Sequence, residues 1–136
     1  MFKNKLVAVL NGSMEGGVIM NALAHMSVGL GGAMDSQNLM LQNYVTAENN
    51  EFPNISAMPF IILKGNSNKI RALVQEARIH KILHTVFTDT MTGGTYLEQL
   101  DNTKAKREED LVFYGVTLFG DWEIVSEMTR KFSLWR

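Results

Sequence analysis

Runs of consecutive apolar residues alternate along this chain with segments whose apolar positions recur every three or four residues. Four runs have the length and composition of buried strands, at residues 5–10, 58–65, 84–90 and 111–120. Asn-Gly-Ser closes the first run, which is typical of a strand that enters a turn. A fifth, shorter strand is predicted in "FSLW" near the end of the chain.

Helical periodicity follows three of these runs. The first helix is predicted from Val18 to about Leu30, where "GLGG" supplies glycines that end helices. The second is predicted in "NSNKIRALVQEARIHKIL", with Asn66 or Ser67 as its N-cap. The last is predicted in "DWEIVSEMTRK", with Asp121 as its N-cap. Strand and helix units therefore alternate along the chain.

Two segments lack a clear period. Residues 33–58 are mixed, and we expect a mobile arm in which "NLMLQNYV" forms a strand or one side of a hairpin. After Gly93 and Gly94, a short helix is predicted at Tyr96 to Leu100. The charge-mixed stretch "DNTKAKREED" has nothing to bury, so a solvated loop is expected there.

This order of elements predicts an α/β fold, specifically a three-layer α/β/α sandwich with a mixed, mostly parallel central sheet. The 136 residues are expected to form a single domain, 1–136. Ligands of such sheets bind beyond the carboxyl ends of the strands, where backbone groups are left unpaired. The segments to search are therefore Asn11–Gly17, Thr88–Gly94 and Gly120.

Composition narrows the chemistry. The chain has 13 basic and 14 acidic side chains, a net charge of −1, so the charge as a whole does not favour a nucleic-acid partner. There are no cysteines, which excludes disulfides, thiolate metal sites and cysteine nucleophiles. Of the three histidines only His80 and His84 are close in sequence, and no acidic third ligand lies nearby, so neither a metal nor a cofactor is expected. The first apolar run is too short to span a bilayer, and we expect a cytoplasmic protein without a membrane partner.

The first predicted helix is apolar on nearly every side but carries Asn21 and His25 four residues apart. Side chains at this spacing meet on one helical face. A helix that is apolar all round is expected to be buried, and a buried histidine must find a partner. Two interpretations stay open: His25 is a hydrogen-bonded core residue, or it faces a cleft in which it acts on a ligand.

The start of this helix and the neighbouring strand ends supply the other candidates. Gly16 and Gly17 let a ligand approach the free N–H groups of the helix, which would suit an anion, although Glu15 opposes a phosphate and the glycines could serve the turn alone. Asn11 and Thr90 are candidate ligand-binding residues at the ends of strands. Asp89 could orient the imidazole of His25 or polarise a water, or it could bond to its own turn.

Three segments resemble an uncharacterised, mainly bacterial family, the domain-of-unknown-function family number two thousand. They are "KLVAVLNGSMEGGVIMNALAHMSVGLG", "MPFIILKGNSNKIRALVQEAR" and "VFYGVTLFGDWEIVSEMTRKFSLWR", and together they cover most of the chain. The spacing Asn21-x-x-x-His25 and the "LFG" turn are the most specific marks of this resemblance. The family is similar in fold to peptidyl-tRNA hydrolase II, so the resemblance implies that fold and, through it, tRNA as a partner.

The match to the hydrolase is incomplete at the residues that carry its chemistry. When His25 is laid on the histidine of the hydrolase's first helix, Gly17 falls on its glycine and Val18 on its lysine, while Asn21 lies one position before the expected glutamine. Asp89 resembles the acidic residue after the third strand, but "TMTGG" does not reproduce the Ala-Gly-x-Thr pattern expected there. A missing cation weakens stabilisation of developing negative charge, so Val18 does not favour ordinary peptidyl-tRNA hydrolysis.

Two functions follow as expectations. The first is binding of a small or anionic ligand, without catalysis, in a cleft at the start of the first helix, with a homodimer through exposed apolar surface left open. The second is a hydrolase that acts on an ester or amide such as a peptidyl-tRNA-like substrate. In the second, His25 is the acid or base, Asp89 orients it or a water, and Asn21 holds a carbonyl or oxyanion. The residues do not decide whether the protein is an enzyme.

Overall fold

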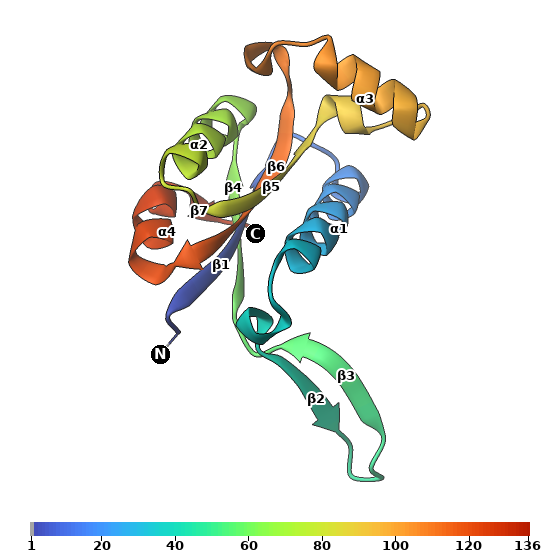
Figure 1. The fold of residues 1–136 in the computed structure, drawn as a ribbon, viewed down its shortest axis with the longest axis vertical. Coiled ribbons are helices and arrows are strands. Elements are labelled where there is room, and N and C mark those ends of the chain that lie inside the picture. The colour runs from blue at the N-terminus through green and yellow to red at the C-terminus, as the bar shows by residue number, and fades with distance from the viewer. Residues whose placement is uncertain (1) are drawn as a thin grey trace.

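A computed structural model describes residues 2–136 (Figure 1). The strands are β1 (Asn4–Asn11), β2 (Leu41–Val45), β3 (Glu51–Ser56), β4 (Phe60–Gly65), β5 (Leu83–Thr88), β6 (Phe113–Asp121) and β7 (Ser133–Leu134). The α-helices are α1 (Gly16–Ala33), α2 (Ser67–Ile79), α3 (Tyr96–Lys104) and α4 (Trp122–Thr129). Three short 3-10 helices are η1 (Ser36–Leu39), η2 (Asp89–Met91) and η3 (Glu108–Asp110).

The central sheet has five strands in the order β5-β6-β1-β4-β7. It is mixed, as expected, but the prediction of a mostly parallel sheet is wrong. In the described part of the chain, only β1 and β4 pair in parallel, and the β1–β6, β5–β6 and β4–β7 pairs are all antiparallel. The reason lies in α3, which stands beyond the end of the sheet instead of covering a face (Figure 1). The chain therefore turns back after β5 and returns as β6 in the opposite direction.

The reversal of β6 separates Gly120 from the other two segments expected to share one edge. Asn11 and Thr88 both reach the edge where β6 begins, since Asn11 bonds to Phe113 and Thr88 pairs with Phe113. Gly120 lies at the other end of β6, beside Lys5 near the start of β1. Gly120 is therefore removed from the edge that holds the other candidates.

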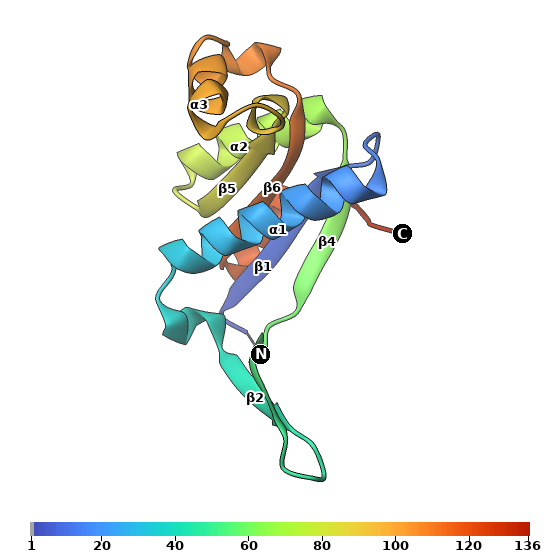
Figure 2. The same cartoon turned by 90° about the vertical axis from the view of Figure 1, so that its right-hand side faces the viewer.

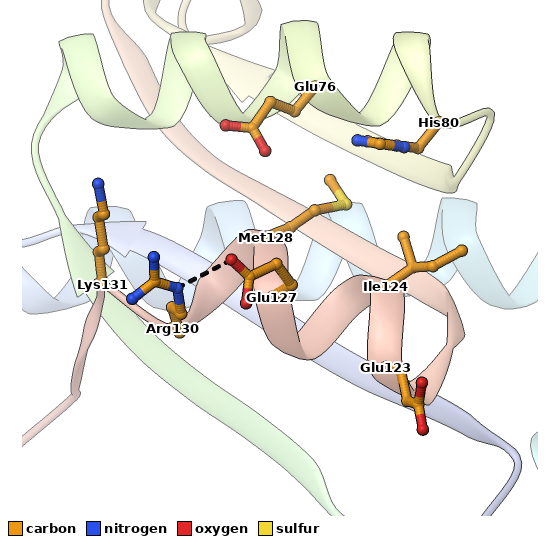
Figure 3. A pocket seen from close by; sticks show the side chains of 8 residues that line it. All are labelled: Glu76, His80, Glu123, Ile124, Glu127, Met128, Arg130 and Lys131. Atoms are coloured by element: carbon orange, nitrogen blue, oxygen red, sulfur yellow. Dashed lines mark hydrogen bonds and ion pairs between the residues drawn. The ribbon is translucent and has the colours of Figure 1, made fainter.

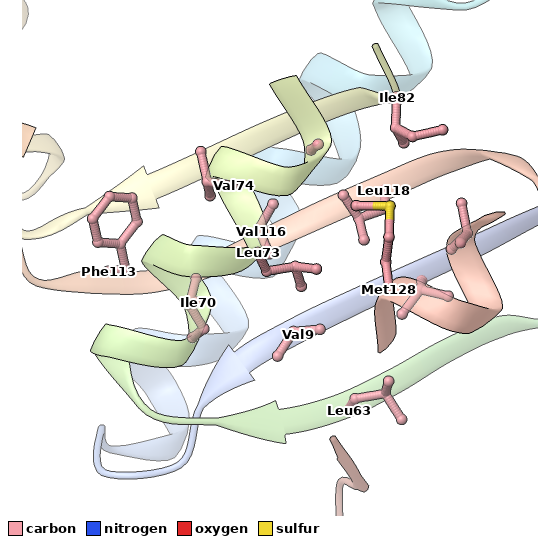
Figure 4. Close-up of a cluster of buried hydrophobic side chains, with 13 residues drawn as sticks. Val9, Leu63, Ile70, Leu73, Val74, Ile82, Phe113, Val116, Leu118 and Met128 are labelled. Atoms are coloured by element: carbon pink, nitrogen blue, oxygen red, sulfur yellow. The ribbon is translucent and has the colours of Figure 1, made fainter. Parts of the chain in front are cut away.

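Helices cover both faces of the sheet, as the sandwich prediction requires. Alternate residues of β1 point to opposite faces, so Val7 and Val9 join a core with α2 and α4, while Ala8 and Leu10 join one with α1. Figure 4 shows the first of these clusters, in which α2 and α4 pack on the sheet. The other face carries α1 (Figure 2).

Local signals placed several helix ends well. Asn66 caps α2 by accepting a hydrogen bond from Lys69 N at 2.9 Å, and Asp121 caps α4 by accepting from Glu123 N and Ile124 N. The solvated loop expected at 101–110 is wrong for its first part. Residues 101–104 continue α3, which begins with a capping box between Thr95 and Glu98.

The segment 33–58 folds into η1 and an antiparallel β2–β3 hairpin that projects from the body (Figures 1 and 2). The residues of "NLMLQNYV" divide between η1 and β2, and β2 forms one side of a hairpin, which is one of the two alternatives that the sequence left open. Within residues 2–136, no helix combines the length and apolar character needed to cross a bilayer.

Candidate functional site

The side chain of the first candidate residue, Asn11, forms hydrogen bonds with the backbone on both its nitrogen and its oxygen. Its side chain is buried, Nδ2 donates to the carbonyl oxygen of Phe113 at 2.9 Å, and Oδ1 accepts from Ser13 N at 2.9 Å. These bonds join the end of β1 to the start of β6 and shape the turn into α1. Gly16 and Gly17 are exposed at the start of that helix, where Glu15 is the N-cap residue and makes no side-chain cap bond.

A groove of about 540 Å³ opens beside the middle of α1, between α1, β5 and α3. The α1 residues that line it, His25, Met26 and Gly29, lie about two and a half to three and a half turns after Gly16. The groove is therefore not at the helix start, where the sequence had predicted the cleft. Its lining residues are mostly apolar: His25, Met26, Gly29, Thr85, Val86, Phe87, Met91, Tyr96, Gln99, Leu100 and Thr103. Of the predicted site residues, only His25 lines this groove.

His25 lies on an exposed strip of α1. The helix buries one stripe, formed by Ile19, Ala22, Met26 and Leu30, so the expectation of a helix buried on all sides is wrong. Asn21 and His25 are both exposed, although Asn21 does not line the groove. The His25 ring stacks on Phe87, with 5.8 Å between ring centroids and an interplanar angle of 29°. The imidazole therefore forms part of an aromatic wall and has a face open to solvent.

Hydroxyl groups fix the two elements that flank the groove. The Thr85 hydroxyl donates to the carbonyl oxygen of Met26 at 2.9 Å, which ties α1 to β5. On the other side, the Thr103 hydroxyl lies 2.6 Å from Thr90 Oγ1, which is 2.8 Å from Thr88 Oγ1. Thr90 is thus a buried link between α3 and β5, placed behind the groove and absent from its lining.

Asp89 lies in a separate cavity. That cavity, of about 380 Å³, is lined by Asp89, Thr90, Thr92, Asn102, Ala105 and Lys106. The carboxylate accepts from Lys106 Nζ at 2.9 Å and from Val112 N at 3.0 Å. Partial burial opposes ionisation, but these two bonds outweigh it and hold the pKa of Asp89 below its usual value. The structure therefore does not bring Asp89 together with His25, and the carboxylate joins β5 to the start of β6.

Replacing Asp89 by asparagine should lower the free energy of unfolding by about 1–2 kcal/mol at pH 7, mostly through the weakened bond from Val112 N, since Lys106 is partly solvated. A lowered folded-state pKa stabilises the fold above the unfolded pKa of about 4 and ceases to do so as pH falls through the folded pKa. Urea titrations at several pH values should therefore show that the difference in free energy of unfolding between wild type and Asp89→Asn becomes smaller below about pH 4.

The control for this measurement is Asp101→Asn. Asp101 is exposed and forms no ion pair within residues 2–136, so its substitution should change stability by less than about 0.5 kcal/mol. A difference in free energy of unfolding between wild type and Asp89→Asn that increases as pH falls would contradict the structural role given to this carboxylate.

Sequence reasoning missed the residues that α3 contributes to the groove. Tyr96, Gln99, Leu100 and Thr103 recur at helical spacing, and Thr95 with Glu98 forms the capping box. The box, together with the apolar stripe after it, was a signal for a longer amphipathic helix. Local sequence patterns do not indicate that this helix would contact η2 and face α1 and β5 across the groove, because that arrangement involves segments that are distant in sequence.

A second groove, of about 450 Å³, lies between α2 and α4 (Figure 3). Its floor is Ile124 and Met128, and its rims carry Glu76, His80, Glu123, Glu127, Arg130 and Lys131. Arg130 is paired with Glu127 at 2.9 Å. No three acidic or histidine side chains in residues 2–136 are placed to hold a metal ion, so these rim carboxylates do not form a metal site.

Comparison with solved structures shows that the fold also occurs in another protein. A structure of a protein of unknown function from Agrobacterium tumefaciens strain C58 superposes with a TM-score of 0.86, covers 100% of both chains and is 17% identical in sequence. At this identity the likeness shows the fold alone. No curated protein matches the chain.

Comparison with known families matches residues 4–136 to the family described as "Protein of unknown function (DUF2000)". The match spans β1 to the last residue and includes the His25 groove and the projecting hairpin. The chain therefore belongs to this family of unknown function, as the segments around Asn21, His25 and the "LFG" turn had indicated.

Proposed function

We propose that the groove between α1, β5 and α3 binds a small, mainly apolar organic ligand that carries a hydrogen-bonding group. The observation that carries this proposal is the His25 ring, which is exposed, stacked on Phe87 and part of the groove wall. Grooves with apolar walls and a few convergent polar groups are typical of small-molecule sites. The protein would act by binding, without a catalytic step.

The walls favour a neutral ligand over an anion. Phe87, Met91 and Leu100 supply apolar surface, while His25 and the side-chain oxygen of Gln99 supply polar atoms. The Thr103 hydroxyl and Gln99 Nε2 donate to groups within the protein. Among the described residues that line the groove, none is Lys, Arg, Asp or Glu. A permanently charged ligand would lose hydration here without gaining a charged partner. We therefore narrow the small or anionic ligand expected from the sequence to a neutral one with a flat apolar part.

A suitable probe is N-acetyl-L-phenylalanine methyl ester, which combines an aromatic ring with amide and ester groups. Titration followed by NMR should shift the imidazole signals of His25 and the ring signals of Phe87 in a saturable manner. His25→Ala should weaken binding by roughly 10-fold, because it removes one hydrogen bond and one ring contact. The matched control is His80→Ala, on the far side of the sheet, which should leave the affinity unchanged.

A different pattern of shifts would overturn the proposal. Saturable shifts confined to the α2–α4 groove would place binding elsewhere. The absence of any saturable shift, at the highest soluble concentration of the probe, would argue against an aromatic ligand in the His25 groove.

A hydrolase acting on an ester or amide is the second candidate. It is favoured by the solvent-accessible imidazole in the groove and by the resemblance to peptidyl-tRNA hydrolase II, which would make a peptidyl-tRNA-like molecule the substrate. Against it, Asp89 lies in a different cavity and bonds to Lys106 and Val112. Methanol release from the same ester tests this candidate directly. We expect release at the uncatalysed rate, whereas turnover lost in both His25→Ala and Asp89→Asn would establish the hydrolase.

A further inference from the structure

The β2–β3 hairpin, which we call the arm, is attached to the body only at its base. Ser56 Oγ donates to the carbonyl oxygen of Leu39, and Ala57 N donates to that of Met40 at 2.9 Å. Beyond this base, the two strands pair with each other and extend away from the sheet (Figures 1 and 2). Within residues 2–136, the arm therefore packs on no other element beyond its base.

One face of the arm is apolar and open. Tyr44 pairs with Phe52, and Gln42 pairs with Ile55, so all four side chains lie on the same face. The two pairs stay on one face because a bulge between them contains Asn54, whose φ of 65° is left-handed. Tyr44, Phe52 and Ile55 are 55%, 59% and 55% exposed. A two-stranded ribbon is marginally stable in water, and such a surface indicates a partner.

The charges of the arm favour a protein partner over a polyanion. Residues 40–57 contain Glu48 and Glu51 and no lysine, arginine or histidine. Nucleic acid and anionic lipid surfaces attract basic side chains and repel this pair of carboxylates. The partner should instead offer apolar side chains with a cation beside them.

The same chain carries such a surface at its other end. On α1 and α3, the exposed apolar residues are Met20, Val28, Tyr96, Leu97 and Leu100. Lys104, the last residue of α3, has no ion-pair partner within residues 2–136. Apolar side chains followed by a free cation complement the apolar face and acidic turn of the arm.

We propose that two copies of this chain exchange arms, so that Tyr44, Phe52 and Ile55 of each copy cover the open side of the α1–α3 groove of the other. The arm and α3 lie at opposite ends of the molecule (Figure 1), and α1 lies between them on the side that faces the viewer in Figure 2. A two-fold axis through that side brings each arm to the other copy's α3. Glu48 and Glu51 then approach Lys104 of the second copy.

The exposed apolar surface is large enough for a specific dimer. On the face that docks, each copy offers Tyr44, Phe52 and Ile55 from the arm, in addition to the five residues on α1 and α3, while Leu41 and Val45 point to the opposite face of the arm. With about half of each side chain exposed, exchange would bury on the order of 1,100 Å² of apolar side-chain surface in total. A specific interface buries at least about 1,000 Å². Contact between the arms alone would bury about 400 Å² and leave the α1–α3 surface open.

The dimer concerns the groove assigned above to a ligand, but it does not depend on that assignment. In the dimer, α1, β5 and α3 form the floor of the site, and aromatic side chains of the second copy close it. Neither single chain then holds the complete site.

Light scattering coupled to gel filtration tests this arrangement on the full chain. We expect wild type at twice the 15.3 kDa of one chain, and one chain's mass for Tyr44→Ser/Phe52→Ser and for Leu97→Asp, with unchanged circular dichroism. The matched control is Ile79→Ser, which alters an exposed apolar residue on α2 and should remain dimeric. Glu48→Lys/Glu51→Lys should weaken the dimer at least 10-fold, and added Lys104→Glu should restore part of that loss.

Two results would overturn the proposal: a monomeric wild type at 100 µM, or a dimer that survives both the arm substitutions and Leu97→Asp. Titration of the wild-type protein with N-acetyl-L-phenylalanine methyl ester, together with its mass, separates the two proposals. If His25 still shifts in a wild-type monomer, the arm exchange fails while the ligand site stands. If the dimer forms but His25 never shifts, the ligand site fails while the arm exchange stands.

Discussion

Replacing Phe113 by alanine should lower the free energy of unfolding by about 3–5 kcal/mol, measured by urea denaturation. Phe113 is 2% exposed and is among the largest fully buried side chains, packed between the sheet and α2 (Figure 4). A domain of this size has about 5–15 kcal/mol of stability in total, so the loss is a large share of it. The backbone bonds of Phe113 to Asn11 and Ser67 remain after the substitution, so the loss measures side-chain packing.

The matched control for Phe113→Ala is Phe52→Ala on the arm. Made in the Leu97→Asp background, where the arm has no partner, it should change stability by less than about 0.5 kcal/mol, because the ring is already in water. Equal losses at the two phenylalanines would mean that the core between β6 and α2 is packed less tightly than the structure shows.

Gly115→Val is expected to cost about 3 kcal/mol, because β6 has no room for a side chain at this position. A Cβ on Gly115 would lie 2.8 Å from Met26 Cε, 2.9 Å from Leu10 Cδ2 and 3.1 Å from the carbonyl oxygen of Val9. The two side-chain ends can move, but the carbonyl is held in the sheet. Relief therefore requires the backbones of β6 and β1 to move and the Met26 side chain to be displaced beside His25, so the substitution should also weaken binding of the ester probe.

Gly32→Ala is the control for Gly115→Val. A Cβ at Gly32 meets nothing within 4 Å, and alanine favours the helical backbone, so this variant should gain up to about 1 kcal/mol. Chemical denaturation and the NMR titration with the ester are measured on both variants. A Gly115→Val protein with wild-type stability and affinity would show that the contact between α1 and β6 does not set the groove.

Local patterns were sufficient for most elements of the fold. β1, β4, β5 and β6 were visible as apolar runs, and α2 and α4 as helical periods that begin at Asn66 and Asp121. These features depend on neighbours within a few residues, so they can be predicted from the sequence. The order and direction of the strands depend on which distant segments pair. β6 lies between β5 and β1, and α3, which connects β5 to β6, lies beyond the end of the sheet. Local sequence patterns do not predict this arrangement.

The candidate site divides in the same way. His25 could be found from its spacing to Asn21, and its exposure on α1 follows from the one apolar stripe that the helix buries. Its neighbours could not be predicted, because Phe87, which stacks on it, and the α3 residues that line the same groove are distant from it in sequence. Asp89 illustrates the converse: a strand-end carboxylate suggested catalysis, but the return of β6 supplies Val112 N as its partner.

Amino-acid order alone predicted most of the helices and strands, although not the full length of α3 or the strand β3. It also established the absence of cysteine chemistry and the polar pair on α1, since each is a property of composition or of residues close in the chain. Folding in three dimensions settled which faces meet. It paired the strands, separated His25 from Asp89, placed α3 over the groove and left the apolar face of the arm uncovered. These outcomes depend on side-chain packing between segments distant in sequence, which short-range periodicity does not encode.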